Sequence, residues 1–157
     1  IQKMLSIILS GSSASFLSKK QADQAELTQL TRTYFQKHPR HYVLLVGDSR
    51  IPTGQLVGVF KSMGIEKRHL RIHTDYSKLK KDFPYEEIAN ENAVGIFVGS
   101  VPHSTKDGGR SASPLGAVRA KKGHMIFSLP DLKITKESLR ELIQLFQHRV
   151  IDVRQMN

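Results

Sequence analysis

The sequence predicts an α/β fold in which an open parallel sheet of four to five strands carries helices on both faces and follows an N-terminal amphipathic helix. Two continuous runs of β-prone apolar residues, Tyr42–Val46 and Ala93–Val98, are typical of strands that are covered on both faces. Apolar residues at helical spacing follow the first run, in the segment Thr53–Met63. Short apolar strands that alternate with such helices indicate a parallel sheet between two layers of helices.

Residues 1–40 are interpreted as an N-terminal helical segment, with the end of an upstream domain as the alternative. From Ser18 to His38, apolar residues recur at near-helical spacing on a polar background, and Pro39 stops the pattern. This pattern predicts an amphipathic helix that packs on the domain that follows. Because the first residue is Ile rather than Met, a fused upstream domain is one of the expected partners.

Residues 41–157 are expected to form one Rossmann-like or flavodoxin-like domain. Its weaker elements are strands at Leu70–Thr74 and Met125–Leu129 and helices from about Ser113 to Lys122 and from Thr135 to Val150. Four strands are few for such a sheet. Either residues 78–92 therefore contain a fifth strand, or an edge strand pairs with a second copy of the chain in a homodimer.

The composition limits the classes of function. The chain has 24 Lys and Arg residues against 14 Asp and Glu residues, a formal net charge of +10 at pH 7, which favours phosphate-rich partners. The absence of cysteine excludes disulfide bonds, cysteine-ligated zinc and a thiolate nucleophile. No apolar run approaches the roughly 20 residues that a membrane helix needs, so we expect a cytoplasmic protein without a membrane partner.

Polar segments follow the predicted strands, at the edge where open α/β sheets bind their ligands. The candidate ligand-binding residues are Gly47, Asp48, Ser49, Arg50, Asp75, Gly99, Ser100, His103, Ser104, Lys106, Arg110 and Ser113. After the first strand, Gly47 permits close backbone approach, Ser49 is placed to donate at a helix N-terminus, and Arg50 is suited to clamp an anion. The segment matches neither G-x-G-x-x-G nor the P-loop motif, and the alternative is a solvated turn in which Asp48 and Ser49 bond local amides.

The other two segments carry similar pairs of interpretations. Asp75 ends the second strand, where dinucleotide-binding domains place an acid that bonds a ribose hydroxyl, and the alternative is a turn-forming aspartate. The segment from Gly99 to Ser113 is long and polar, leaves a buried strand and enters a helix, so we interpret it as the ligand loop. In that loop His103 and Arg110 are the candidate specificity residues, and the alternative role of His103 is to cap a backbone carbonyl.

Catalysis has little support in the sequence. A Ser/His/Asp set has no G-x-S-x-G motif, and neighbouring residues of an extended segment point apart. The histidines lack metal-ligand spacing, so we expect neither a metal site nor a required cofactor, with a bound nucleotide as the one candidate. The remaining catalytic hypothesis is a hydrolase that uses His103 with Asp48 or Asp75.

In the order of its elements, the segment from Tyr42 to Val150 resembles the broad group of Rossmann-like nucleotide and oligonucleotide sensor domains. The resemblance implies a regulatory domain that binds a nucleotide or another phosphorylated ligand at the carboxyl edge of its sheet. The net charge suggests an alternative, a nucleic-acid-binding accessory module of a DNA- or RNA-processing protein. The hydrolase is the second alternative.

Overall fold

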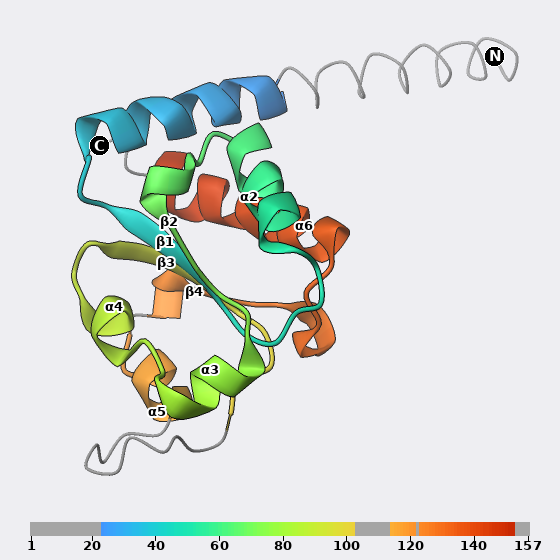
Figure 1. Cartoon of the computed structure of the whole chain (residues 1–157). Helices are drawn as coiled ribbons and strands as arrows, with labels where there is room; N and C mark the ends of the chain where they lie inside the picture. The colour runs from blue at the N-terminus through green and yellow to red at the C-terminus, as the bar shows by residue number, and fades with distance from the viewer. Residues whose placement is uncertain (1–22, 103–113, 122, 153–157) are drawn as a thin grey trace, which may run out of the picture.

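A computed structural model of the chain describes residues 23–102, 114–121 and 123–152. In this part of the chain four parallel strands form one sheet, shown in Figure 1. The strands are β1 (Tyr42–Val46), β2 (Leu70–His73), β3 (Ala93–Val98) and β4 (Ile126–Ser128), in the spatial order β2-β1-β3-β4. The prediction of an open parallel α/β sheet is confirmed.

Helices cover both faces of this sheet, as predicted (Figure 1). One face carries α2 (Thr53–Ser62), α6 (Lys136–Phe146) and the N-terminal helix, which the structure describes over residues 23–37. The other face carries α3 (Tyr76–Lys81), α4 (Tyr85–Ala89) and α5 (Pro114–Arg119). Shorter turns are η1 (Lys67–His69), η2 (Gly123–Met125), η3 (Pro130–Leu132) and the π-helical turn η4 (Gln147–Asp152), which continues α6.

The segment 78–92, considered above as a place for a fifth strand, contains helical turns instead. Leu79 of α3 and Tyr85 and Ile88 of α4 are buried against the sheet, together with Phe83 between the two helices. A strand would have placed successive side chains on opposite faces, whereas this spacing turns the apolar residues toward one side. The described sheet therefore has four strands.

The central strands divide the core into two clusters because their side chains alternate between the faces. Val43 and Leu45 of β1 pack with Phe97 of β3 in the cluster under α2 and α6. Leu44 and Val46 belong to the cluster under α3, α4 and α5. All five residues of β1 are buried, as the continuous apolar run predicted.

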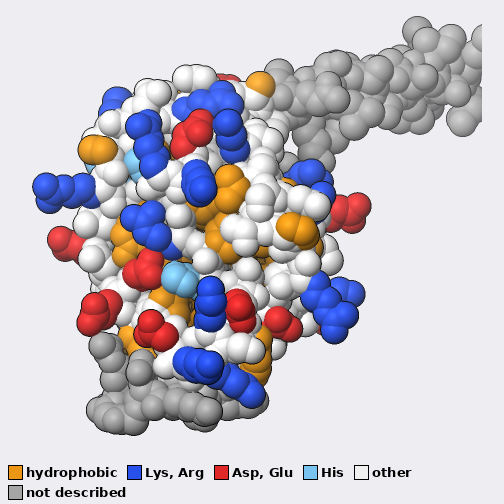
Figure 2. Space-filling view, viewed as in Figure 1, with side chains coloured by type: hydrophobic (Ala, Val, Ile, Leu, Met, Phe, Trp, Pro, Cys, Tyr) orange, Lys and Arg blue, Asp and Glu red, His pale blue; other side chains and the backbone are white. Residues whose placement is uncertain are grey.

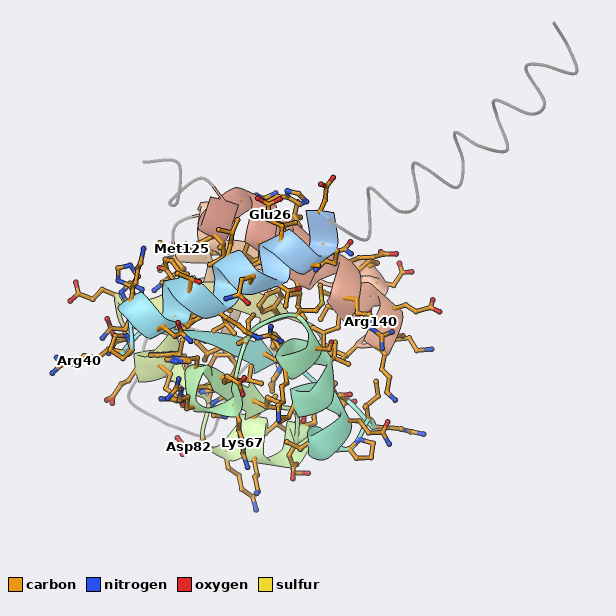
Figure 3. All side chains as sticks on the ribbon, turned by 90° about the horizontal axis from the view of Figure 1, so that it is seen from above. Glu26, Arg40, Lys67, Asp82, Met125 and Arg140 are labelled. Carbon is orange, nitrogen blue, oxygen red and sulfur yellow. The ribbon has the colours of Figure 1, made fainter. Side chains whose placement is uncertain are left out.

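The N-terminal helix is attached to the same core through buried side chains. It runs across the top of the molecule in Figure 1 and across the side nearest the viewer in Figure 3, and its Tyr34 and Phe35 belong to the cluster under α2 and α6. Gln147, which is fully buried, donates from Nε2 to Thr31 Oγ1 (3.2 Å) and to the carbonyl oxygen of Met63 (2.8 Å). This side chain thus connects the N-terminal helix to the ends of α2 and α6, and its hydrogen bonds satisfy polar groups that would be costly to bury unpaired.

His69 fixes the segment before β2 against the N-terminal helix. Its side chain is 2% exposed, its ring lies 4.9 Å from the ring of Phe35, and its Nδ1 donates to the carbonyl oxygen of His41 (3.0 Å). Burial lowers the pKa of His69 below its ordinary value, and the nearby positive charges of Arg68 and Arg71 lower it further. His69 is therefore neutral in the folded protein at neutral pH.

The lowered pKa predicts that part of the folding stability depends on pH. In the unfolded chain His69 has the ordinary pKa of 6.5, so below that pH the unfolded state binds a proton that the folded state resists. This component of the free energy of unfolding is complete above about pH 6.5 and is lost as the pH falls toward the folded pKa of His69. Urea denaturation at several pH values measures it.

The matched variant is His69→Gln, which keeps an N–H donor and cannot titrate. We expect the wild-type protein to lose more stability than this variant between about pH 7 and about pH 5. The same pH dependence in both proteins would contradict the assignment.

Candidate functional site

The carboxyl ends of β1 and β3 lie side by side at one edge of the sheet. In register, Val46 is paired with Val98, so the two strands end level with each other. Beyond the strands, the Asp48 amide donates to the Ser100 carbonyl oxygen (2.8 Å), and the Gly99 amide donates to the Val46 carbonyl oxygen (2.8 Å). Since the chain leaves β1 for β2 on one side while β3 lies on the other, this is the point where the strand order reverses and α/β sheets bind ligands.

Gly47 and Gly99 allow this close approach of the two strand exits. Gly47 has a φ of 144°, which side-chain-bearing residues rarely adopt, and a Cβ there would lie 2.7 Å from Gly99 Cα. A Cβ on Gly99 would lie 3.1 Å from Cγ1 of Ile134, which packs over it. Backbone packing at this edge thus requires glycine at position 47, whereas a Cβ at position 99 would need the Ile134 side chain to shift by a few tenths of an ångström.

The amides of the β1 exit are engaged within the protein. Gly47 donates to the carbonyl oxygen of His73 (3.0 Å) and Ser49 to that of Thr74 (3.3 Å). Two side chains of this exit can serve a ligand. The Ser49 hydroxyl oxygen accepts from the Ile51 amide (3.1 Å) while its hydrogen remains a donor, and the guanidinium of Arg50 is exposed.

A cavity of about 590 Å³ opens beside this exit. It is lined by Asp48, Ser49, Arg50, Ile51, Lys133, Ile134, Thr135, Lys136 and Glu137. Ile134 is buried and Ile51 half-buried, so apolar side chains form the bottom of the cavity. The charged side chains are exposed and form its rim, with Arg50, Lys133 and Lys136 as cations and Asp48 and Glu137 as anions.

Five of the nine residues that line this cavity, residues 133–137, are not among the site residues predicted from the sequence. Thr135 begins α6 with a capping box, in which Thr135 Oγ1 accepts from the Ser138 amide (3.0 Å) and Ser138 Oγ accepts from the Thr135 amide (3.0 Å). The next amides, of Lys136 and Glu137, belong to the first helical turn, which lacks intrahelical acceptors. The sequence marked Thr135 as a helix start, but only the strand order places that start beside β1.

Asp75 lies in a neighbouring cavity rather than in this one. Its Oδ1 accepts from the Lys78 amide (3.3 Å), so it is the N-cap of α3, the local role considered as the alternative to ribose binding. The cavity around it measures about 250 Å³ and also contains Thr53, His73, Thr74 and Asp82.

The structure brings together six of the predicted ligand residues at the paired exits: Gly47, Asp48, Ser49, Arg50, Gly99 and Ser100. The predicted residues His103, Ser104, Lys106, Arg110 and Ser113 lie outside the described part of the chain. Asp48 and Asp75, the two acids offered as partners of His103, line different cavities.

Within 23–102, 114–121 and 123–152, the structure holds no group of three or more His, Asp or Glu side chains arranged to bind a metal ion. None of the helices in these ranges has the length and apolar character to cross a membrane.

Comparison with protein-family models, with curated proteins and with solved structures found no match for this chain.

The capping role of Asp75 is testable through stability. Asp75→Ala removes the acceptor of the Lys78 amide and is expected to lower the free energy of unfolding by about 1 kcal/mol. Asp75→Asn keeps a side-chain oxygen in the same place and should change stability by no more than a few tenths of a kcal/mol. Chemical denaturation measures the free energy of unfolding of both variants. Equal losses of this free energy in Asp75→Ala and Asp75→Asn would show that the carboxylate charge, and not the cap, stabilises this turn.

Proposed function

We propose that the protein is a regulatory (sensor) domain that binds a nucleotide or another phosphorylated ligand between the exit of β1 and the start of α6. The observation that carries the proposal is the cavity of about 590 Å³ beside the point of strand-order reversal. Its volume lies within the range of roughly 300–1,000 Å³ that small-molecule sites occupy.

The lining offers a suitable partner for each part of such a ligand. The guanidinium of Arg50 can bind a phosphoryl group through two hydrogen bonds, and Lys133 and Lys136 add positive charge from the segment before α6 and its first turn. The amides at the start of α6 favour an anion as well, because the positive end of the helix dipole lies there.

The remaining groups suit a nucleoside. Ile51 and Ile134 at the bottom of the cavity form an apolar surface for a base, and the carboxylates of Asp48 and Glu137 accept hydrogen bonds from ribose hydroxyls. Among the described residues that line this cavity there is no histidine to serve as a general base for Ser49. Binding is therefore better supported than turnover, and the hydrolase stays the less favoured alternative.

Isothermal titration with mono-, di- and cyclic nucleotides tests the proposal. We expect at least one to bind, and Arg50→Ala to weaken its binding by about tenfold or more, since a charge-assisted bidentate contact is lost. Lys133→Ala with Lys136→Ala should have a similar effect. Lys61→Ala is the matched control, because it also removes one exposed positive charge but lies at the far end of α2, outside the cavity.

Two outcomes would overturn the proposal. One is the absence of heat with every nucleotide at millimolar concentration. The other is unchanged affinity in Arg50→Ala and in the double lysine variant, which would place the ligand elsewhere on the molecule.

The nucleic-acid-binding alternative needs a continuous basic surface. In Figure 2, Lys and Arg side chains gather over the N-terminal helix and η1, at the amino end of the sheet, whereas Asp and Glu side chains are interspersed with them lower down. The side chains that would bind a nucleic acid on this face thus gather at the other end of the sheet from the β1 exit. They support the nucleic-acid-binding alternative separately and do not support the proposed cavity.

A further inference from the structure

A second cavity lies at the amino end of the sheet, between the N-terminal helix and the segment that leads into β2. Its volume is about 420 Å³. It is lined by Arg32, Phe35, Gln36, Gly64, Glu66, Lys67, Arg68 and His69. None of these residues belongs to the site proposed above, so the two cavities are independent.

The walls of this cavity are held in place by packing. Gly64 has a φ of 95°, and a Cβ there would collide with the carbonyl oxygen of Thr28, so the end of α2 lies directly against the N-terminal helix. Phe35 and His69, each 2% exposed, pack ring against ring beneath the opening. The cavity is therefore already formed, and a ligand would bind without a large loss of conformational entropy in its walls.

The charges around the cavity are unbalanced. Arg32, Lys67 and Arg68 are exposed cations, and Glu66 is the one carboxylate that lines the cavity with them. In the described ranges none of these three cations forms an ion pair, whereas the nearby Arg71 lies 3.6 Å from Glu87. Three exposed cations without an ion-pair partner among the described residues line this one cavity, and together they create a positive potential that attracts an anion.

His69 complements an anion that also carries a hydroxyl. Because its Nδ1 donates to the carbonyl oxygen of His41, the neutral ring keeps Nε2 as an acceptor. Among the described residues Nε2 has no hydrogen-bond partner. The side-chain amide of Gln36 also lines the cavity, which thus holds neutral acceptors and donors as well as three cations.

From this arrangement we propose that the cavity lined by Arg32, Lys67 and Arg68 is a second anion site, which binds the phosphoryl group of a small phosphorylated molecule. The guanidinium groups of Arg32 and Arg68 match the geometry of phosphate oxygens. A nucleic-acid strand is the less suitable source of the phosphate, because the aromatic rings here are buried and offer no platform on which successive bases stack.

Titration of the ¹⁵N-labelled protein with pyrophosphate, followed by NMR, tests the proposal. We expect saturable shifts of the backbone amides of residues 64–69, and we expect Arg68→Ala and Arg32→Ala each to weaken the binding by about tenfold or more. Both side chains are exposed, and Arg68 contributes only its carbonyl oxygen to a hydrogen bond with Arg71, so folding should be unaffected. The control is Arg140→Ala, which removes an exposed cation of α6 and should bind pyrophosphate as the wild type does. Arg140 and Lys67 are both labelled in Figure 3.

A second variant separates this site from the one proposed above. In Arg50→Ala the shifts of residues 64–69 should persist, whether or not the nucleotide site proves real. Shifts that grow linearly without saturation, or that are equally weak in Arg140→Ala and Arg68→Ala, would overturn the proposal.

A second titration, with an oligonucleotide, distinguishes a small phosphorylated molecule from a nucleic-acid strand as the source of the phosphate. A single-stranded oligonucleotide without a terminal phosphate should bind residues 64–69 more weakly than pyrophosphate does. Tighter binding of the oligonucleotide to the same residues would overturn the proposal in favour of a nucleic-acid surface.

Discussion

The parallel pairing of β1 with β3 is the constraint on which the rest of the structure depends. It requires glycine at position 47, because a Cβ there would overlap the backbone of Gly99. Because the strand order is β2-β1-β3-β4, the chain leaves β1 toward β2 on one side and leaves β3 toward β4 on the other, and the register places these two exits level with each other. The reversal of strand order produces an edge at which an exit loop and the start of a distant helix border one cavity.

The same pairing gives the two ends of the sheet different chemistry. At the carboxyl end, polar side chains and the start of α6 surround an apolar floor, which suits a ligand with both a charged and an apolar part. At the amino end, the N-terminal helix and the turn before β2 contribute the cations that line a cavity above the buried Phe35 and His69 rings. The two proposed sites are therefore separated by the full length of the strands, and a ligand at one does not occupy the other.

Much of the fold could be predicted from the sequence, because β1 and β3 are continuous apolar runs and α2 and α6 have regular apolar spacing. The secondary structure of the segment 78–92 was harder to predict, because its helices α3 and α4 are too short to show a repeated apolar spacing. The candidate site was predicted in part. Residues directly after β1 and β3 were identified by position, but the contribution of residues 133–137 depends on strand order, which local patterns do not encode. The packing role of Gly47 likewise depends on a partner distant in sequence, Gly99.

The most direct test of the account is a nuclear Overhauser measurement at the edge itself. If β1 and β3 are parallel neighbours that end together, the α-protons of Gly47 should give a strong cross-peak to those of Gly99. The Asp48 amide should also be protected from exchange by its bond to Ser100. Cross-peaks from Gly47 to Ala93, at the opposite end of β3, would mean that the strands run antiparallel. In that case no shared edge, and no ligand site built on it, would exist.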